Sequence, residues 1–334
     1  MKHSNIAIFV PHNGCPHACT FCNQRKITGQ SCQPTPQDVN NAVETARRTA
    51  DTKHTEIAFF GGSFTAIDRT YMLSLLEAAA PYVWSGEFHG IRLSTRPDAV
   101  DEEILDILKR HGVTAIELGT QSMCDDVLYV NKRGHTVQDS IHAAQLIQKY
   151  GFSLGLQMMT GLYGSSDEKD IFTAEKIAEL HPDTVRIYPT IVMQGTELAD
   201  LYREGKYIPQ TLENAVPLCA KLLRLFEEKN IRVIRLGLHD SESLKQNMLA
   251  GAYHPAFREL CESEMIFHHT LSLLAERGIF EGTVTFSVSP KSVSIFVGQK
   301  KANLEKLRNK NINAVVRQDS SLSRYEIKIT VHCE

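Results

Sequence analysis

The sequence predicts an α/β protein built on a parallel sheet, followed by a small C-terminal α+β domain. Two observations carry this prediction. Short apolar, β-branched runs alternate with longer amphipathic stretches up to about residue 190, and polar or glycine-rich motifs follow those runs. Repeated strand–helix–strand units pair in parallel with right-handed connections, so the sheet either opens as a doubly wound fold or curls into a barrel. A functional site is expected at the carboxyl edge of its strands.

Periodicity predicts six strands and at least three helices in this first part of the chain. The strands are residues 5–10, 55–62, 91–95, 113–119, 153–159 and 184–189. The helices are residues 37–50, 101–112 and 136–151, with Gly112 as a C-terminal stop and Thr136 as an N-cap. Helices dominate from about residue 210 to 277, and residues 231–238 read as one more strand.

The pattern changes near residue 278, where we place a domain boundary between residues 1–277 and residues 278–334. The tail reads as β-β-α-β-β, with residues 292–298 as its second strand. Basic residues concentrate around the helix of this tail: Lys300, Lys301, Lys306, Arg308 and Lys310.

The stretch "IFVGQKKANLEKLR" in the tail loosely resembles the loop with which KH domains clamp a nucleic-acid backbone. Lys301 stands where the second glycine of that loop would be. An RNA partner bound through the C-terminal domain is therefore one hypothesis, and an ordinary solvated lysine-rich helix is the other.

Composition is that of an ordinary globular protein, with 42% hydrophobic and 22% charged residues and a net charge of -3 over 334 residues. No apolar run approaches the roughly 20 residues of a membrane span, so we expect no membrane partner. The apolar patch at the N-terminus is too short for a signal peptide, and five scattered cysteines argue against a disulfide framework. We therefore expect a reducing, cytoplasmic setting.

The strongest chemical signal is "GCPHACTFC", which places Cys15, Cys19 and Cys22 within eight positions. Three soft thiolates suit a soft metal or a cluster. A structural zinc site needs a fourth ligand, for which the candidates are His12, His17 and Cys32. A redox pair of Cys19 and Cys22 is a third reading. An iron–sulfur cluster held by only three cysteines would leave one iron open to a small molecule.

Further candidate residues follow the predicted strands. "FFGGSFT" ends the second strand with Gly61 and Gly62 before Ser63, which lets the backbone approach a ligand and offers carbonyls to an ammonium group. A tight turn with Ser63 or Thr65 as a helix cap explains the same motif.

"ELGTQS" places Gln121 at the end of the fourth strand, where its amide can bond a ribose or a carboxylate. Arg133 follows as a permanently charged partner for a carboxylate, or else as a solvated cation at a helix end. "GLQMMTG" places Gln157 at the end of the fifth strand.

The spacing C-x3-C-x2-C resembles that of the radical S-adenosylmethionine (SAM) superfamily. Phe21 before the last cysteine, a strand before the motif, and a strand ending in "GGSFT" about 40 residues later add to the resemblance. It implies a partial (β/α)6 barrel, a [4Fe-4S] cluster on Cys15, Cys19 and Cys22, and SAM bound to the open iron. It also implies reductive cleavage of SAM to a 5′-deoxyadenosyl radical for substrate modification, with electrons from a flavodoxin- or ferredoxin-type donor.

The resemblance also implies contacts between the chain and SAM. The expected residues are Phe21, Gly61, Gly62, Ser63, Ser94, Gln121, Arg133 and Gln157. Phe21 would lie beside the adenine, and the two glycines would hold the amino group. In related oxygen-independent coproporphyrinogen oxidases, acidic residues match Gln157 and lie near Ser94. This sequence has neither acid, although both side chains still form hydrogen bonds.

Four phrases are similar to the Elongator catalytic-subunit group of the superfamily: "STRPD", "ELGTQSMCDDVLYVNKRGHT", "RIYPTIVMQGTEL" and "AGAYHPAFRELCESE". That group carries an acetyltransferase domain and modifies the wobble uridine of tRNA, whereas here we expect no such domain. The predicted function is a radical SAM enzyme with an unidentified substrate. The alternatives are an RNA-modifying radical SAM enzyme and, in a different class, a zinc-stabilised binding protein without turnover.

Overall fold

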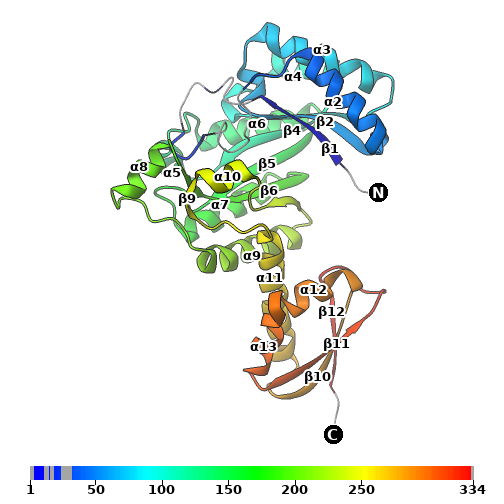
Figure 1. The fold of residues 1–334 in the computed structure, drawn as a ribbon, viewed down its shortest axis with the longest axis vertical. Coiled ribbons are helices and arrows are strands. Elements are labelled where there is room, and N and C mark those ends of the chain that lie inside the picture. Colours follow the sequence, from blue (N-terminus) through cyan, green and yellow to red (C-terminus); the bar gives the residue numbers. More distant parts are fainter. Residues whose placement is uncertain (1–3, 11–14, 16–18, 24–31, 332–334) are drawn as a thin grey trace. The chain divides into compact units, whose positions relative to one another are not determined.

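The computed structural model describes residues 4–10, 15, 19–23 and 32–331, and its contacts divide the chain into two compact units (Figure 1). The first unit comprises Met1–Thr211 and Phe226–Tyr253, and the second comprises Leu212–Leu225 and His254–Glu334. The predicted boundary near residue 278 stays a prediction.

The first unit is built on a curled parallel sheet of seven strands in the order β1-β2-β3-β4-β5-β6-β8. The strands are β1 (Ser4–Val10), β2 (Thr55–Gly61), β3 (Gly90–Thr95), β4 (Val113–Gln121), β5 (Ser153–Thr160), β6 (Thr184–Pro189) and β8 (Arg232–Leu236). This confirms the partial barrel and all seven of its predicted strands. Neighbours in sequence are neighbours in the sheet, as expected for consecutive βαβ units.

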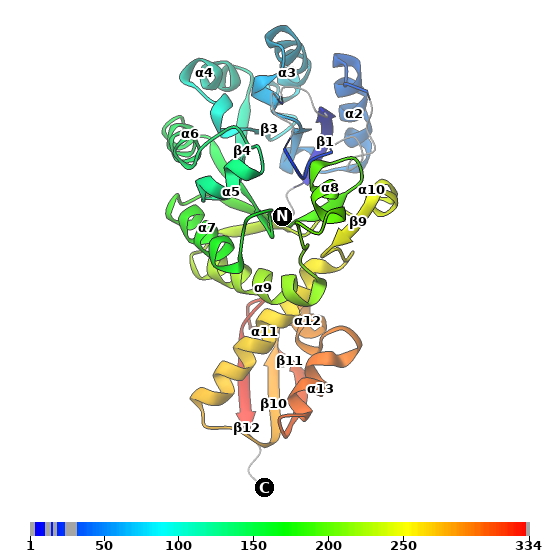
Figure 2. The ribbon, with the colours of Figure 1, turned by 90° about the vertical axis from the view of Figure 1, so that its left-hand side faces the viewer.

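Helices lie outside the curled sheet, and Figure 2 shows α3, α4, α6 and α7 around its outer side. The helices before β10 are α2 (Pro36–Thr49), α3 (Arg69–Trp84), α4 (Glu102–Arg110), α5 (Asp125–Val130), α6 (Val137–Lys149), α7 (Asp167–Glu179), α8 (Glu197–Arg203), α9 (Leu212–Glu228), α10 (Glu242–Asn247) and α11 (Phe257–Glu276). The predicted cap is confirmed, since Thr136 and Asp139 form a capping box at the start of α6. None of the described helices is both long enough and apolar enough to cross a membrane.

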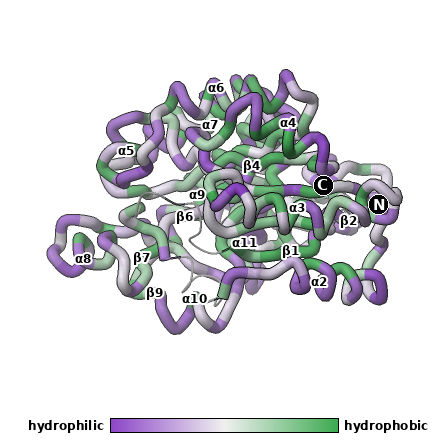
Figure 3. The backbone as a smooth tube through the Cα atoms, turned by 90° about the horizontal axis from the view of Figure 1, so that it is seen from above, coloured by the Kyte–Doolittle hydropathy of each residue, from purple (hydrophilic) through white to green (hydrophobic). Residues whose placement is uncertain are grey.

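Side chains along each strand alternate between the two faces of the sheet. Ile57, Phe59, Ile91 and Leu93 are fully buried on the face that the helices cover. Figure 3 shows the result, with hydrophobic stretches along the strands and hydrophilic stretches along the outer helices. The other set of side chains faces the inside of the curl and, as described below, is largely polar.

A small two-stranded sheet that was not predicted from the sequence pairs β7 (Ile191–Met193) with β9 (Met248–Gly251) in antiparallel fashion. Val192 of β7 is buried with Leu198 of α8, and Met193 is buried with Leu244 of α10. Both strands have fewer than five residues, which is too few for their alternation to be recognised.

The second unit contains a three-stranded sheet in the order β11-β10-β12. Its elements after α11 are β10 (Gly282–Val288), α12 (Val293–Val297), α13 (Ala302–Arg308), β11 (Ile312–Gln318) and β12 (Ile327–Val331). Strand β11 is parallel to β10, and β12 is antiparallel to it. The core of this unit joins Phe286 of β10 with Ile266 of α11, Phe296 of α12 and Leu307 of α13, so the three helices cover one face of the sheet.

The prediction of a second strand over residues 292–298 is wrong, because these residues form α12. The tail is therefore β-α-α-β-β rather than β-β-α-β-β. Alternating valines and serines suggested a strand, but the adjacent Ile295 and Phe296 are both buried. Adjacent side chains point to opposite faces of a strand, whereas both can face the core from one side of a helix.

Candidate functional site

The described cysteines of the N-terminal motif follow β1 and lie beside the carboxyl ends of β2 and β4. The thiol of Cys15 accepts a hydrogen bond from the backbone N–H of Ser63, directly after β2. The guanidinium Nη1 of Arg133, in the segment after β4 and α5, lies 3.1 Å from Cys19 Sγ. The N–H of Cys22 donates to the carbonyl of Cys19 at 3.1 Å. Burial raises the pKa of Cys15, and so does the neighbouring Cys19. Cys15 and Cys19 are therefore close enough to interact electrostatically.

The segment between Cys19 and Cys22 is anchored by Thr20, which is almost fully buried. Its hydroxyl donates to Asn131 Oδ1 at 2.7 Å, and its carbonyl accepts from the N–H of Leu198 at 2.8 Å. Phe21 packs against the apolar cluster that contains Leu198 and Tyr207. The two partners of Thr20, Asn131 and Leu198, lie more than 100 residues further along the chain. Their hydrogen bonds therefore anchor the cysteine segment to the rest of the first unit.

The glycine motif brings the backbone at the end of β2 close against the end of β1, the parallel strand beside it. Gly61 has a φ of +120°, and a Cβ there would lie 2.9 Å from the carbonyl oxygen of Val10. The N–H of Gly62 donates to the same oxygen at 2.8 Å. The close approach of the two backbones and the positive φ therefore require glycine at position 61.

Ser63 is fully buried, and its hydroxyl lies 3.0 Å from that of Thr95 and accepts the N–H of Arg96 at 3.2 Å. It does not cap the short turn Phe64–Ala66 that follows. Ser63 thus binds the end of β3, and its interpretation as a helix cap is wrong.

Arg133 is only 7% exposed, so its interpretation as a solvated helix-end cation is wrong. Its Nη2 donates to the carbonyl of Gly119 at 2.7 Å, and its Nε has no hydrogen-bond partner. Nearby Arg96 is neutralised by Asp98, with two contacts of 2.9 Å, and donates to the carbonyl of Arg133 at 2.6 Å. Within the described chain, Arg133 has no carboxylate partner of its own. A buried guanidinium in this state favours the approach of an anion.

Gln121 and Gln157 are brought together on the inner face of the sheet. Gln121 ends β4 with a φ of +65°, where the pairing with β5 is irregular, and its Oε1 accepts a hydrogen bond from Gln157 Nε2 at 3.2 Å. Ser94 of β3 is half-buried and lies in register with Glu117 of β4. The sequence thus predicted correctly that these side chains lie near the carboxyl edge of the sheet.

An ion-pair network fills the inner face below this edge. Its members are Glu56 of β2, Arg92 of β3, Glu117 of β4 and Arg186 of β6. Arg92 donates to Glu56 at 2.6 Å and to Glu117 at 3.2 Å, and Arg186 donates to Glu117 at 2.8 Å. The Arg186 guanidinium also lies 5.0 Å from the centroid of the Phe60 ring. Burial works to lower the pKa of Arg186, but the Glu117 carboxylate more than offsets it, so the pKa is raised.

This network was not predicted from the sequence. A signal was present, because charged residues occur at the inward positions of three strands: Glu56 two residues before Ala58, Arg92 two residues before Ser94, and Arg186 two residues before Tyr188. Charges within apolar runs are rarely buried unless they are paired.

His135, also missed, is buried two residues after Arg133. Its Nε2 donates to the carbonyl of Thr120 at 3.3 Å, and its Nδ1 has no partner. Burial, followed by the charge of Arg133, lowers the pKa of His135 to about 4. The imidazole is therefore neutral at physiological pH and helps to shape the turn that carries Arg133.

Two of the three candidates for a fourth zinc ligand, His12 and His17, lie outside the described residues. Cys32 is exposed. Among the described side chains, no three or more of His, Cys, Asp and Glu are spaced to hold a metal ion.

Two family models match the chain. The model of the Radical SAM superfamily matches residues 9–177, and that of the Radical_SAM C-terminal domain matches residues 182–266.

Several named proteins are similar to the chain. The "tRNA uridine(34) acetyltransferase" of Methanocaldococcus jannaschii is 33% identical over 187 residues, covering 50% of this chain and 35% of that protein. The protein of the same name from Dehalococcoides mccartyi is 27% identical over 281 residues, covering 71% and 61%. "Elongator complex protein 3" of Schizosaccharomyces pombe is 36% identical over 139 residues, covering 41% and 26%. The chain thus covers less than two thirds of the length of each of these relatives.

Solved structures show the same fold. The archaeal Elp3 of Methanocaldococcus infernus superposes with a TM-score of 0.62 at 22% identity, covering 83% of this chain and 63% of that chain. SuiB of Streptococcus suis bound to S-adenosylmethionine superposes with a TM-score of 0.52 at 14% identity, covering 75% and 52%. The resemblance noted in the sequence is confirmed at the level of the fold.

The network makes the free energy of unfolding sensitive to Glu117. Glu117→Gln leaves Arg186 without a carboxylate in a buried site, and we expect a loss of about 3 kcal/mol. Urea unfolding followed by circular dichroism measures it, with Glu103→Gln as the control, because its partner Arg69 is half exposed and such pairs contribute about 0.5 kcal/mol. Adding Arg186→Met to Glu117→Gln should restore much of the loss. Equal effects of the Glu117 and Glu103 substitutions would contradict this account.

His135 predicts a pH dependence of stability. Its folded pKa of about 4 lies below its ordinary value of 6.5, so it favours folding above pH 6.5, and this contribution is lost as the pH falls from 6.5 to 4. The loss is on the order of 3 kcal/mol. His135→Gln keeps a donor toward Thr120 without titrating, so its stability should fall less over the same interval. Parallel urea titrations at several pH values test this, and equal pH slopes for the two proteins would contradict it.

Proposed function

The chain belongs to the radical SAM superfamily, and on this premise we propose that it is an enzyme that cleaves SAM reductively at a [4Fe-4S] cluster to modify a substrate. The observation that carries the proposal is Arg133, a buried guanidinium with no carboxylate partner in the described chain and an orphaned Nε, 3.1 Å from Cys19. Such a cation beside cysteine sulfurs suits an anionic ligand that approaches a metal cluster.

The residues at the carboxyl edge of the sheet fit both the [4Fe-4S] cluster and SAM. Three thiols are the donors that iron–sulfur clusters use, and three leave a coordination position for a further ligand. In our proposal Cys15, Cys19 and Cys22 hold the cluster. When bound, cluster and SAM together supply the reductive cleavage that yields methionine and a 5′-deoxyadenosyl radical.

We assign the polar groups around the thiols to the parts of SAM that they match chemically. Arg133 binds the carboxylate, and the backbone of Gly61 and Gly62 receives the ammonium group. Gln121 and Gln157 bond the ribose hydroxyls with their amides. Three further residues complete the assignment: Ser63 fixes the turn, Ser94 lines the inner face, and Phe21 lies against the adenine.

The ion-pair network on the inner face of the sheet also supports the proposed radical chemistry. Glu56, Arg92, Glu117 and Arg186 satisfy one another, so they form a fixed polar wall without inviting bulk water. A reactive radical needs surroundings that do not admit water, because the protein's task is to orient the reactants and exclude competing reactions.

The proposal includes an electron donor of the flavodoxin or ferredoxin type and a cytoplasmic location. No disulfide joins the seven cysteines that the described residues include, which accords with a reducing setting. The competing proposal, a zinc-stabilised binding protein without turnover, would use the same three cysteines with a fourth ligand.

RNA is the second candidate substrate class within the same chemistry. Two of the similar proteins are named tRNA uridine(34) acetyltransferase, and a third is named Elongator complex protein 3. The basic residues of the C-terminal stretch 278–334 give this candidate a second, independent basis, which is developed below.

Anaerobic reconstitution with iron and sulfide should load about four irons and four sulfides per chain. Dithionite and SAM should then release 5′-deoxyadenosine, because SAM is cleaved at the cluster. Cys22→Ala should lose cluster and cleavage but keep its fold by circular dichroism, whereas Cys32→Ala should retain both as the matched control. One zinc per chain without sulfide, together with loss of folding in Cys22→Ala, would support the zinc protein instead.

Arg133→Lys should raise the KM for SAM about tenfold, because a compact ammonium does not replace a two-point guanidinium contact with a carboxylate. Iron content should stay that of the unsubstituted protein, which separates SAM binding from cluster assembly. Lys132→Ala is the control, since this neighbouring cation is exposed and pairs with Glu197. An unchanged KM in Arg133→Lys would remove Arg133 from the proposed contacts.

A further inference from the structure

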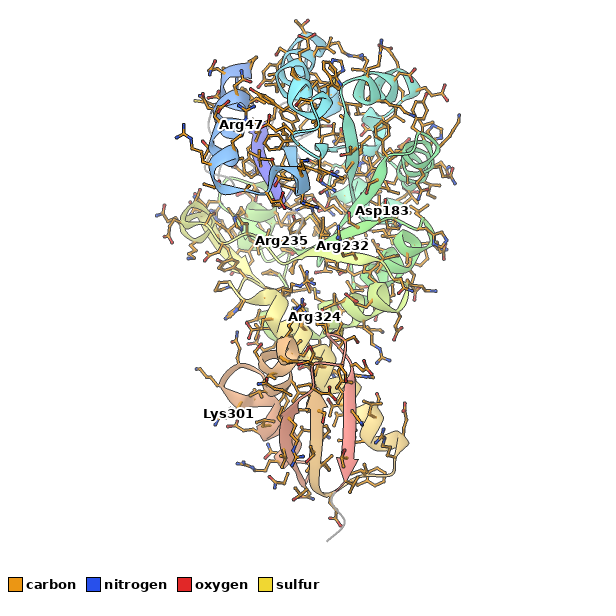
Figure 4. All side chains as sticks on the ribbon, turned by 90° about the vertical axis from the view of Figure 1, so that its right-hand side faces the viewer. Arg47, Asp183, Arg232, Arg235, Lys301 and Arg324 are labelled. Carbon is orange, nitrogen blue, oxygen red and sulfur yellow. The ribbon has the colours of Figure 1, made fainter. Side chains whose placement is uncertain are left out.

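The second unit carries a positively charged loop, Gly298–Lys301, between its two short helices α12 and α13 (Figure 4). We propose that this loop binds the sugar–phosphate backbone of single-stranded RNA. The choice of RNA rests on the RNA-modifying candidate above, but the binding itself requires neither a cluster nor SAM.

The shape of the loop is unusual and specific. Gly298 has a φ of +77°, and a Cβ there would lie 3.1 Å from the backbone nitrogen of Asn303. Lys300 and Lys301 follow with φ values of +52° and +66°, a region that non-glycine residues rarely adopt. Two consecutive lysines in this region persist only where the surrounding structure holds them, and such strain concentrates at functional sites.

Asn303 is the residue that holds the loop. Its side chain is buried, and its Nδ2 lies 3.2 Å from the carbonyl oxygen of Phe296 in α12 and 3.0 Å from that of Ser263 in α11. One amide thus ties the end of α12 to a second helix beneath the loop. None of these contacts uses a lysine side chain, so the loop is fixed independently of its charge.

The charge of the loop is available to a ligand. Lys300 and Lys301 are exposed, and neither forms an ion pair within the described part of the chain. Figure 4 shows Lys301 on the helical side of the unit, away from the strands. Lys306 differs, because it pairs with Glu264 at 2.8 Å and lies over the Phe267 ring.

Residues 278–334 carry nine lysines and arginines against five acidic residues, although the whole chain has a net charge of -3. Positive charge is therefore concentrated in residues 278–334. Ammonium groups bind phosphate oxygens as point charges and read no base sequence. A short glycine-led loop that clamps the backbone is the means by which KH domains hold nucleic acid. These features favour salt-sensitive binding with little sequence preference.

The test uses the full chain and a fluorescent single-stranded RNA of about 20 nucleotides, with anisotropy measured between about 50 and 200 mM salt. Lys300→Asn/Lys301→Asn removes both charges with a residue that tolerates positive φ. Its Kd should rise about tenfold at about 100 mM salt, and the slope of log Kd against log salt should fall by about 1.4. The single variant Lys301→Gln, with an expected loss of about threefold, decides the question if the double variant fails to fold.

The matched control is Arg317→Ala/Lys328→Ala. Both residues are exposed and lie in register on either side of Ser287, on the face of the sheet opposite the core, so the same charge is removed elsewhere. Its RNA affinity should match that of the unsubstituted chain.

Three results would overturn the proposal: loop variants that bind like the unsubstituted chain, an equal loss in the control, or binding to phosphatidylserine vesicles but not to RNA. SAM cleavage by the unsubstituted enzyme without RNA is measured separately. Failure of RNA binding is thereby distinguished from failure of the proposed radical chemistry.

Discussion

The carboxylate of Glu117 is shared by two guanidinium groups, those of Arg92 and Arg186, and the polar inner face of the sheet depends on it. Parallel sheets covered by helices normally bury apolar side chains on both faces. Here each charged group is buried with its partner, and removing one leaves the other uncompensated in a low dielectric. The charged side chains inside the curl are therefore stabilised by pairing with one another rather than by contact with water.

Strand β4 links this ion-pair network to the edge of the sheet where Cys15 and Cys19 lie. Glu117 lies in β4, the carbonyl of Gly119 accepts from Arg133, and Gln121 ends the strand with a positive φ. Because these residues are two positions apart, they lie along one face of one strand. The carbonyl that holds Arg133 therefore lies only two residues along the strand from Glu117. Neutral His135, packed beneath the same turn, adds no positive charge that would compete with Arg133 for an anion.

Sequence patterns predicted those structural elements that depend only on residues close together in the chain. The seven strands, the capping box at Thr136 and the placement of the cysteines after β1 each follow from patterns within a few residues. The network around Glu117 was not predictable in this way, because its partners come from four strands and meet only once the order of the sheet is known. Asn303 was missed for the same reason: its acceptors lie 7 and 40 residues away in sequence. In α12, an alternating pattern was overridden by the packing of Ile295 and Phe296 against the core of the second unit.

The proposed reaction needs both a protected site for the radical and a surface that attracts the substrate, and we assign these two roles to different units. An enclosed site for a radical has its charges paired and buried, so it offers few free cations to attract a large polyanion. Exposed cations such as Lys300 and Lys301 attract one over a distance of about 8–10 Å at physiological salt, and they do so without disturbing the buried network. Since Asn303 fixes their loop through backbone carbonyls, the charge of the loop can change while its shape is retained. In the proposed reaction, affinity for a substrate and protection of the radical would thereby be separable, each depending on its own set of residues.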